Sequence, residues 1–288
     1  MSVDVLQDKI RKRKNPTMLE LGLSLSEIPA QFEANASGYG TFCRELLEGL
    51  KQTVGAVRVS FAAFAMLGPD GLAELTKTLK AAAAMGYYVA LDAPEILSPA
   101  GAQLIADSIF GQGSSYPCDG LVISGYLGSD GIKPFLGYCK KEKKDVFVVA
   151  RTANKSAPEL QDLLSGSRVV HAVAADYVNR YGQDTAGKSG YTRVGILAAA
   201  SSAESLRTLR MKYPKLFLLV DGLDYPNANG KNCATAFDKF GHGAAVCAGS
   251  SITAAWKQTE SDGSDFLLHA QAAADRVKKN LTRYVTVL

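Results

Sequence analysis

The chain has 288 residues, of which 47% are apolar and 21% charged, fractions typical of a globular protein with a large buried core. Its 32 basic and 28 acidic residues give a net charge of only +4, so the composition gives no reason to expect a nucleic-acid partner. No apolar run approaches the roughly 18 residues that span a bilayer, and the charged N-terminus lacks the pattern of a signal peptide. A soluble protein without a membrane partner is predicted.

The cysteines favour a reducing compartment. They are five in number, widely spaced and without a CxxC pair. This pattern argues against a disulfide framework or a zinc site, and we predict neither a metal nor a cofactor. A cytoplasmic location follows, although the pattern does not exclude an organelle.

Eight short apolar runs alternate with longer amphipathic segments, and the first is preceded by a basic segment, residues 9–14, that we interpret as the solvated end of a first helix. The alternative for that segment is a targeting or polyanion-binding patch. The expected strands are 18–24, 54–61, 87–92, 120–124, 146–151, 193–198, 216–221 and 244–247. The expected helix 72–85 is followed by Gly86 as its C-cap.

Eight strands alternating with helices predict a single (β/α)₈ barrel that spans residues 1–288. A helix at about 3–14 is expected to pack across the bottom of the barrel, and a closing helix and tail occupy about 265–288. The competing fold is an open doubly wound sheet. That fold usually has a glycine-rich loop after its first strand, and residues 24–29 contain no glycine.

Charged residues gather at the predicted carboxyl ends of the strands, where barrel enzymes place their active sites. They are Glu20, Arg58, Asp92, Arg151, Asp221 and Asp224. One interpretation is a remodelled pocket in which the two arginines bind an anion and Asp92 or Asp221 acts as a base. The other, which we favour, is a network of ion pairs that neutralise one another and plug the barrel mouth.

Four segments carry a resemblance to a known family. They are Asn15-Pro16-Thr17, the run YLGSDGIKPF at 126–135, Arg151-Thr152-Ala153-Asn154, and ELQDL at 159–163. They resemble the longer bacterial branch of the orotidine 5′-phosphate decarboxylases, over about residues 3–257. The resemblance implies a (β/α)₈ barrel, usually a homodimer, in pyrimidine biosynthesis. It also implies an alternating lysine–aspartate array whose second lysine protonates the carbanion left by CO₂.

Several positions depart from the pattern of that family. Arg58 stands where the first lysine is expected, Asp92 matches the first aspartate, Pro94 aligns with the proton-donating lysine, and Leu97 aligns with the last aspartate. Glu20-Leu21-Gly22-Leu23 aligns with a Gly-Leu-Asp-Pro segment, and Ser124-Gly125 with Asn-Pro. At the phosphate site of the family, Pro226, Asn227 and Ala228 replace a glutamine and glycines, and Ser250 replaces an arginine.

These departures lead us to predict a pseudoenzyme, inactive as a decarboxylase, that acts as a structural or interaction subunit. The alternatives are an enzyme or small-molecule binder with new specificity at the remodelled mouth, and residual orotidine 5′-phosphate decarboxylase activity. Ser250-Ser251 could still hold a phosphate through backbone N–H groups, or could simply cap a helix. Cys247 is expected to be buried and inert rather than a nucleophile.

Leu97 bears on association. The family's last aspartate reaches into the neighbouring subunit, so an apolar residue at that position suggests an interface that has become drier. We predict a homodimer, or a heterodimer with a paralogue from this family. A larger assembly that contains such a dimer is a further alternative. The alternative is a monomer in which Leu97 folds inward to fill the barrel mouth.

Overall fold

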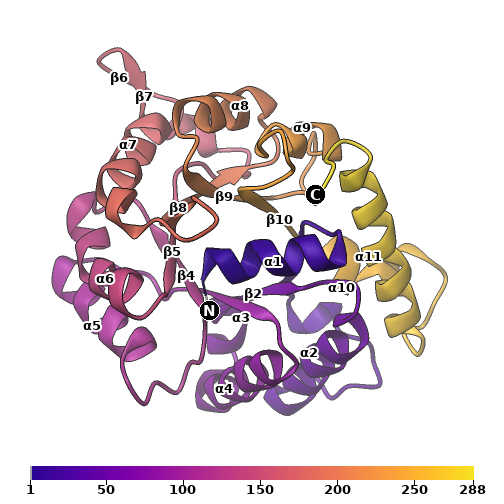
Figure 1. Cartoon of the computed structure of the whole chain (residues 1–288). Coiled ribbons are helices and arrows are strands. Elements are labelled where there is room, and N and C mark those ends of the chain that lie inside the picture. Colours follow the sequence, from indigo (N-terminus) through magenta and orange to yellow (C-terminus); the bar gives the residue numbers. More distant parts are fainter. Residues whose placement is uncertain (1) are drawn as a thin grey trace.

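Eight parallel strands close into a barrel in the computed structural model of this chain, which describes residues 2–288 (Figure 1). Their order around the barrel is β1-β10-β9-β8-β5-β4-β3-β2. The strands are β1 (Thr17–Leu21), β2 (Ala56–Ser60), β3 (Tyr88–Asp92), β4 (Gly120–Ser124), β5 (Asp145–Val149), β8 (Thr192–Ala199), β9 (Leu216–Asp221) and β10 (Ala244–Ala248). The predicted (β/α)₈ barrel is confirmed, and the open sheet is wrong.

Helices cover the outside of the barrel, which explains why its strands are almost continuously apolar (Figure 1). The longer ones are α2 (Ala36–Leu50), α4 (Gly68–Ala84), α5 (Pro99–Phe110), α6 (Ser129–Lys141), α7 (Val170–Gly182), α8 (Ala203–Lys212) and α11 (Phe266–Thr282). Inside the barrel, the rings of Phe147 and Phe217 meet at 6.1 Å between centroids. The lower barrel is therefore a packed core.

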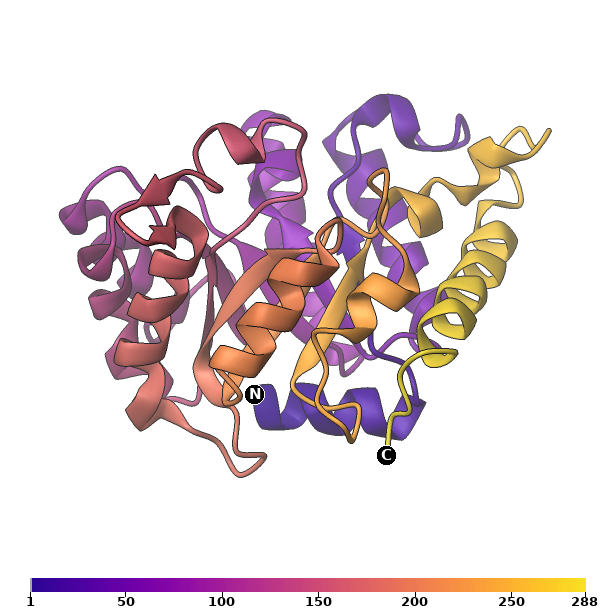
Figure 2. The ribbon, with the colours of Figure 1, turned by 90° about the horizontal axis from the view of Figure 1, so that it is seen from above.

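Helix α1 (Val3–Arg13) lies across the amino-terminal end of the barrel, as predicted (Figures 1 and 2). Its apolar face, Val3, Leu6 and Ile10, is buried in one cluster with Met18 and Tyr88 from the strands. The carboxyl ends of the strands face the opposite side of the molecule (Figure 2). They form the barrel mouth.

Local capping residues account for the differences in element boundaries. Strand β1 ends at Leu21 rather than Ser24, because Ser24 and Glu27 form a capping box on the short helix η1 (Leu25–Glu27). Helix α4 begins earlier than predicted because a proline is tolerated in its first turn. Gly86 follows it with φ +82°, a conformation that favours glycine. A small hairpin, β6 (Leu164–Ser165) and β7 (Arg168–Val169), was not predicted and lies outside the barrel (Figure 1).

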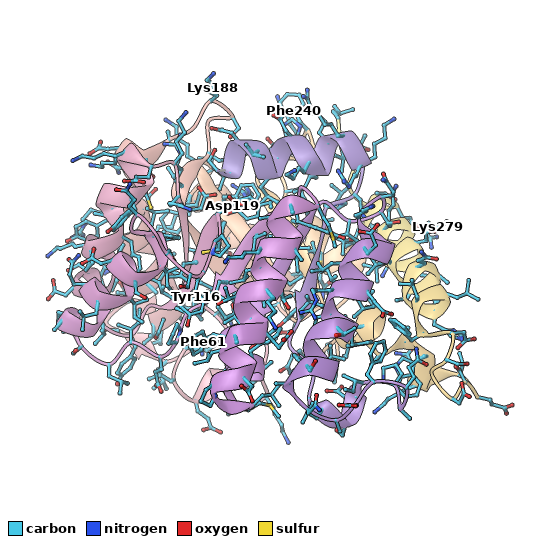
Figure 3. The ribbon with its side chains drawn as sticks, turned by 90° about the horizontal axis from the view of Figure 1, so that it is seen from below. Phe61, Tyr116, Asp119, Lys188, Phe240 and Lys279 are labelled. Carbon is cyan, nitrogen blue, oxygen red and sulfur yellow. The ribbon has the colours of Figure 1, made fainter. Side chains whose placement is uncertain are left out.

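An aromatic contact anchors the chain just beyond β2. Phe61 begins the short helix α3 (Phe61–Ala65), and its ring meets that of Tyr116 edge-on, 6.3 Å between centroids (Figure 3). This contact packs the start of α3 against the loop that precedes β4. Over residues 2–288, every helix is too short or too polar to cross a membrane.

Candidate functional site

A cluster of four charged side chains lies in the barrel mouth and is centred on Arg58 of β2. Its Nε donates to Oδ1 of Asp92, the last residue of β3, at 2.7 Å, and its Nη1 donates to Oδ1 of Asp221, the last residue of β9. Glu20 of β1 is the third partner, with Oε1 at 3.8 Å from Nη1. The guanidinium, only 11% exposed, thus reaches from one wall of the barrel to another.

The charges in this cluster do not balance, and the pKa values reflect this. Burial alone would lower the pKa of Arg58, but Asp92, Asp221 and Glu20 outweigh it and hold that pKa well above its usual range. Burial raises the pKa of Glu20 to about 7, and the negative charges of Asp221 and Asp92 add to this against the opposing effect of Arg58. Glu20 is the carboxyl that gains least from the guanidinium, because Arg58 makes its two short contacts with the aspartates.

The mouth is not filled by these ion pairs. A hollow of about 250 Å³ lies beside Arg58 and Asp92, and its other walls are mainly apolar. Pro94, Ile96, Val122, Ser124 and Val149 are among the residues that line it. A larger hollow of about 570 Å³ adjoins it, with Ser124 in the walls of both. Four of the six charged residues singled out from the sequence therefore meet in one cluster, and this cluster leaves room for a ligand.

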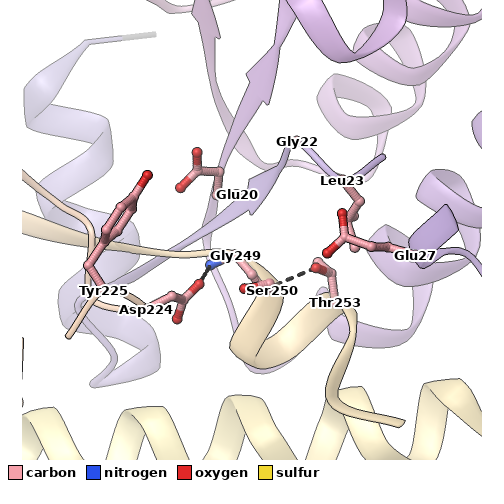
Figure 4. A pocket seen from close by; sticks show the side chains of 9 residues that line it. All are labelled: Glu20, Gly22, Leu23, Glu27, Asp224, Tyr225, Gly249, Ser250 and Thr253. Carbon is pink, nitrogen blue, oxygen red and sulfur yellow. Dashed lines mark hydrogen bonds between the residues drawn. The ribbon is translucent and has the colours of Figure 1, made fainter. Parts of the chain in front are cut away.

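A third hollow, of about 260 Å³, lies between the loops that follow β1, β9 and β10 (Figure 4). Its lining residues are Glu20, Gly22, Leu23, Glu27, Asp224, Tyr225, Gly249, Ser250 and Thr253. Oδ2 of Asp224 accepts hydrogen bonds from the backbone N–H groups of Gly249 at 2.8 Å and Ser251 at 3.4 Å. The amide of Ser251, for which we left phosphate binding and helix capping open, thus faces a carboxylate of the protein itself. Pro226, which the resemblance aligns with the phosphate site of the decarboxylases, is exposed.

Arg151 does not join the cluster, and its predicted role beside Arg58 is wrong. Its Nε and Nη2 donate to the two carboxylate oxygens of Asp162 at 2.9 and 2.8 Å, a bidentate pair. The same carboxylate lies 3.1 Å from Nδ1 of His171. Hydrogen bonds from Arg151 lower the pKa of Asp162, which fits a carboxylate that holds the loop after β5 in place.

Sequence reasoning missed several residues of the third hollow. Glu27, Tyr225 and Thr253 were not singled out, although the Ser24-x-x-Glu27 spacing is typical of a capping box and marks a turn at this point. Leu97 does not fold inward, since it is 77% exposed. Burial raises the pKa of the Cys247 thiol, and all five cysteines are buried, in agreement with inert thiols.

The fold and the mouth together define a (β/α)₈ barrel with a charged, hollow carboxyl end, the end at which barrel enzymes carry out catalysis. The chain is similar in sequence to several enzymes named orotidine 5′-phosphate decarboxylase. An orotidine 5′-phosphate decarboxylase of Rhodopirellula baltica is 29% identical over 229 residues, which cover 78% of this chain and 76% of that relative. The enzyme of that name from Clostridium novyi is 24% identical over 286 residues, 98% of each chain.

Solved structures agree with the fold. A Toxoplasma gondii protein assigned as an orotidine-monophosphate decarboxylase superposes with a TM-score of 0.83 at 22% identity, covering 98% of this chain and 96% of that one. At this identity the similarity shows the fold alone. No protein-family profile matches the chain.

These relatives overturn the prediction of an inactive structural or interaction subunit. Relatives that cover 78% and 98% of this chain bear the name of a carboxy-lyase, and these matches are compatible with residual decarboxylase activity. The prediction went wrong because it judged activity from the positions that depart from the family pattern, among them Pro94, Leu97 and Ser250. It gave too little weight to Arg58 and Asp92, which still meet as a charged pair at the mouth.

Proposed function

We propose that this chain is a slow carboxy-lyase that acts on an orotidine-type substrate, a pyrimidine nucleoside or nucleotide with a ring carboxylate. The single observation that carries the proposal is the pair formed by Arg58 of β2 and Asp92, the last residue of β3. The resemblance places the first lysine and the first aspartate of the decarboxylase array at these two positions. Relatives that are named for this reaction and match 98% of the chain support the same proposal.

The hollow beside this pair suits the pyrimidine ring. Pro94, Ile96 and Val149 offer apolar walls to a flat ring, and Asp92 and Arg58 stand at its charged side. A ring carboxylate held next to Asp92 would be repelled, and the repulsion would disappear as CO₂ leaves. The positive charge of Arg58 would then stabilise the electron pair that remains on the ring carbon.

That carbon needs a proton, and Glu20 is our choice of donor. Neither Pro94 nor Leu97 carries a transferable proton, and the raised pKa of Arg58 makes it a poor acid. Glu20 has its pKa raised to about 7 and lies 3.8 Å from the guanidinium. In the proposed reaction the bond between the ring carbon and the carboxylate breaks, CO₂ leaves, and the carbon takes its proton from the Glu20 carboxyl.

We further propose that the lysine–aspartate array is incomplete and that turnover is correspondingly slow. Loss of a well-placed general acid costs about 10²–10⁴ in rate, so turnover should fall below that of an ordinary family member by at least this factor.

The test is CO₂ release from orotidine 5′-phosphate and from orotidine, using protein purified from a host that lacks its own decarboxylase. We expect slow release that depends on the protein and falls at least about tenfold in Asp92→Asn, because that change removes a charge from the reacting side of the hollow. Asp184→Asn makes the same charge change beyond the amino-terminal end of β8 and should have no effect. Release equal to that of heat-denatured protein, or release unaltered by Asp92→Asn, would refute the proposal.

A second proposal concerns association, as a dimer of this chain or with a paralogue. Leu97 and Tyr126 are 77% and 83% exposed and line the large hollow at the mouth. Large exposed apolar side chains beside one another suit an interface. We expect a dimer by sedimentation at micromolar concentration and a weaker one after Leu97→Asp, with Leu268→Asp as a control on the distant helix α11. A monomer in both the parent protein and the variants would show this expectation to be wrong.

A further inference from the structure

The carboxylate of Asp224 accepts hydrogen bonds from two backbone amides, at the place where (β/α)₈ barrels commonly bind phosphate. In many (β/α)₈ barrels the loops after the seventh and eighth strands hold a phosphate group. Here β9 and β10 are those strands, and the amide of Gly249 after β10 donates to Oδ2 of Asp224 (Figure 4). The amide of Ser251 donates to the same oxygen. The protein itself therefore supplies the anion at this place.

The surrounding hollow is acidic. Three carboxylates, those of Glu20, Glu27 and Asp224, line it, and its lining contains no lysine, arginine or histidine. A Cβ placed on Gly249 would lie 3.4 Å from Oδ2 of Asp224 and 3.6 Å from Oε2 of Glu20, so two carboxylates flank this residue. The nearby cation, Arg58, is engaged by Asp92 and Asp221.

A phosphate in this hollow would meet like charges at short range without a guanidinium or ammonium to pair with. The repulsion between these charges makes such an arrangement unfavourable. A ribose has the opposite fit. Its hydroxyl groups can donate hydrogen bonds to the carboxylate of Glu27 and to the carbonyl oxygen of the protonated Glu20 carboxyl, and the hydroxyl of Tyr225 is a further polar group.

We propose that Asp224 is a specificity-determining residue that substitutes for a ligand phosphate, so that the barrel mouth takes a nucleoside in preference to a nucleotide. This inference rests on the proposed function and narrows its substrate class to carboxy-pyrimidine nucleosides without a 5′-phosphate. Asp224 excludes the phosphate in two ways: it fills the space at the amides of Gly249 and Ser251, and it repels a second anion.

The experiment is a calorimetric titration of the full chain with uridine and with uridine 5′-monophosphate, in the parent protein and in Asp224→Ala and Asp224→Asn. The parent protein should bind uridine at least as tightly as the nucleotide. Asp224→Ala frees both amides and removes the charge, so its affinity for the nucleotide should rise at least about tenfold, the size of a charge-assisted hydrogen bond. Its affinity for uridine should change little.

Asp224→Asn separates the two effects, because asparagine keeps an acceptor for the amides but carries no charge. We expect a smaller gain for the nucleotide than in Asp224→Ala. Asp184→Asn, with the same charge change at the other end of the barrel, should leave both affinities unchanged. Melting temperatures show whether each variant is folded.

Two results would overturn the inference while leaving the proposed function intact: a parent protein that prefers the nucleotide by more than about tenfold, or an Asp224→Ala variant without any gain for the nucleotide. Failure of both ligands to bind any folded variant would overturn the proposed function as well.

Discussion

Replacing Arg58 by alanine is expected to destabilise the fold by about 3–5 kcal/mol, the usual cost of removing one partner of a buried ion pair. The guanidinium neutralises Asp92 and Asp221 through direct hydrogen bonds and faces Glu20 at 3.8 Å. Without it, three carboxylates that are each less than one third exposed would face one another without a cation. Urea unfolding at neutral pH measures the loss.

The loss of unfolding free energy in Arg58→Ala should depend on pH. The carboxylates can take up protons as the pH falls, which removes their mutual repulsion, so the destabilisation should be largest at pH 8 and should shrink towards pH 5. Arg58→Lys should recover part of the stability, because it keeps the charge but lacks the planar group that reaches both aspartates. No decarboxylation is expected from Arg58→Ala at any of these pH values.

Lys133→Ala is the matched control. Its partner is Asp130 at 3.0 Å, and both side chains are more than half exposed, so the pair should contribute at most about 1 kcal/mol. An Arg58→Ala variant that loses no more stability than Lys133→Ala, or that loses the same amount at pH 5 and pH 8, would show that the mouth does not depend on its central cation.

The barrel could be predicted because its signals are local. Each strand is a short apolar run between turns, and eight such runs alternate with helices. The pairing of Arg58 with Asp92 could also be anticipated, since β2 and β3 are consecutive and end at the same side of the sheet. Both residues are defined by their place on regular elements.

The remainder of the site depends on loops, where sequence spacing says little about direction. Arg151 follows β5 directly, yet the chain turns back and brings Asp162 to it, so the arginine is occupied away from the cluster. Asp224 lies beyond β9, and only the folded loop reveals that its carboxylate reaches the amides after β10. Activity is hard to predict from sequence for the same reason. An alignment shows which side chains of the family are absent, but it does not show which other side chains the fold brings next to the site.

Glu20 is the residue whose titration should be most visible. Burial and the neighbouring aspartates raise its pKa to about 7, well above that of a carboxyl in an unfolded chain. Between the two pKa values the folded protein binds a proton that the unfolded chain does not. The contribution of Glu20 to stability is therefore most favourable below the unfolded pKa of about 4.5, and it declines as the pH rises to about 7.

Glu20→Gln keeps the shape of the side chain and removes this ionisation. Relative to the parent protein, the variant should be equally stable near pH 4.5 and more stable by about 1–3 kcal/mol at pH 8. Thermal unfolding across this range measures the difference. Glu95→Gln, which changes an exposed residue of the other hollow of the mouth, is the control, and a similar rise in both variants would contradict the assignment.

Glu20→Gln, which should make the protein more stable at pH 8, should lower its decarboxylase activity. Only the protonated carboxyl can deliver a proton to the ring carbon, so decarboxylation by the parent protein should fall about tenfold per pH unit above pH 7. Glu20→Gln should lower the rate about 10²-fold at pH 6 and abolish this pH dependence, because glutamine has no acidic proton to transfer. Single-turnover measurements at several pH values separate the proton transfer from substrate binding. A variant that is more stable at pH 8 yet keeps the parent's rate and pH profile would confirm the buried, titrating carboxyl and refute its role as the proton donor.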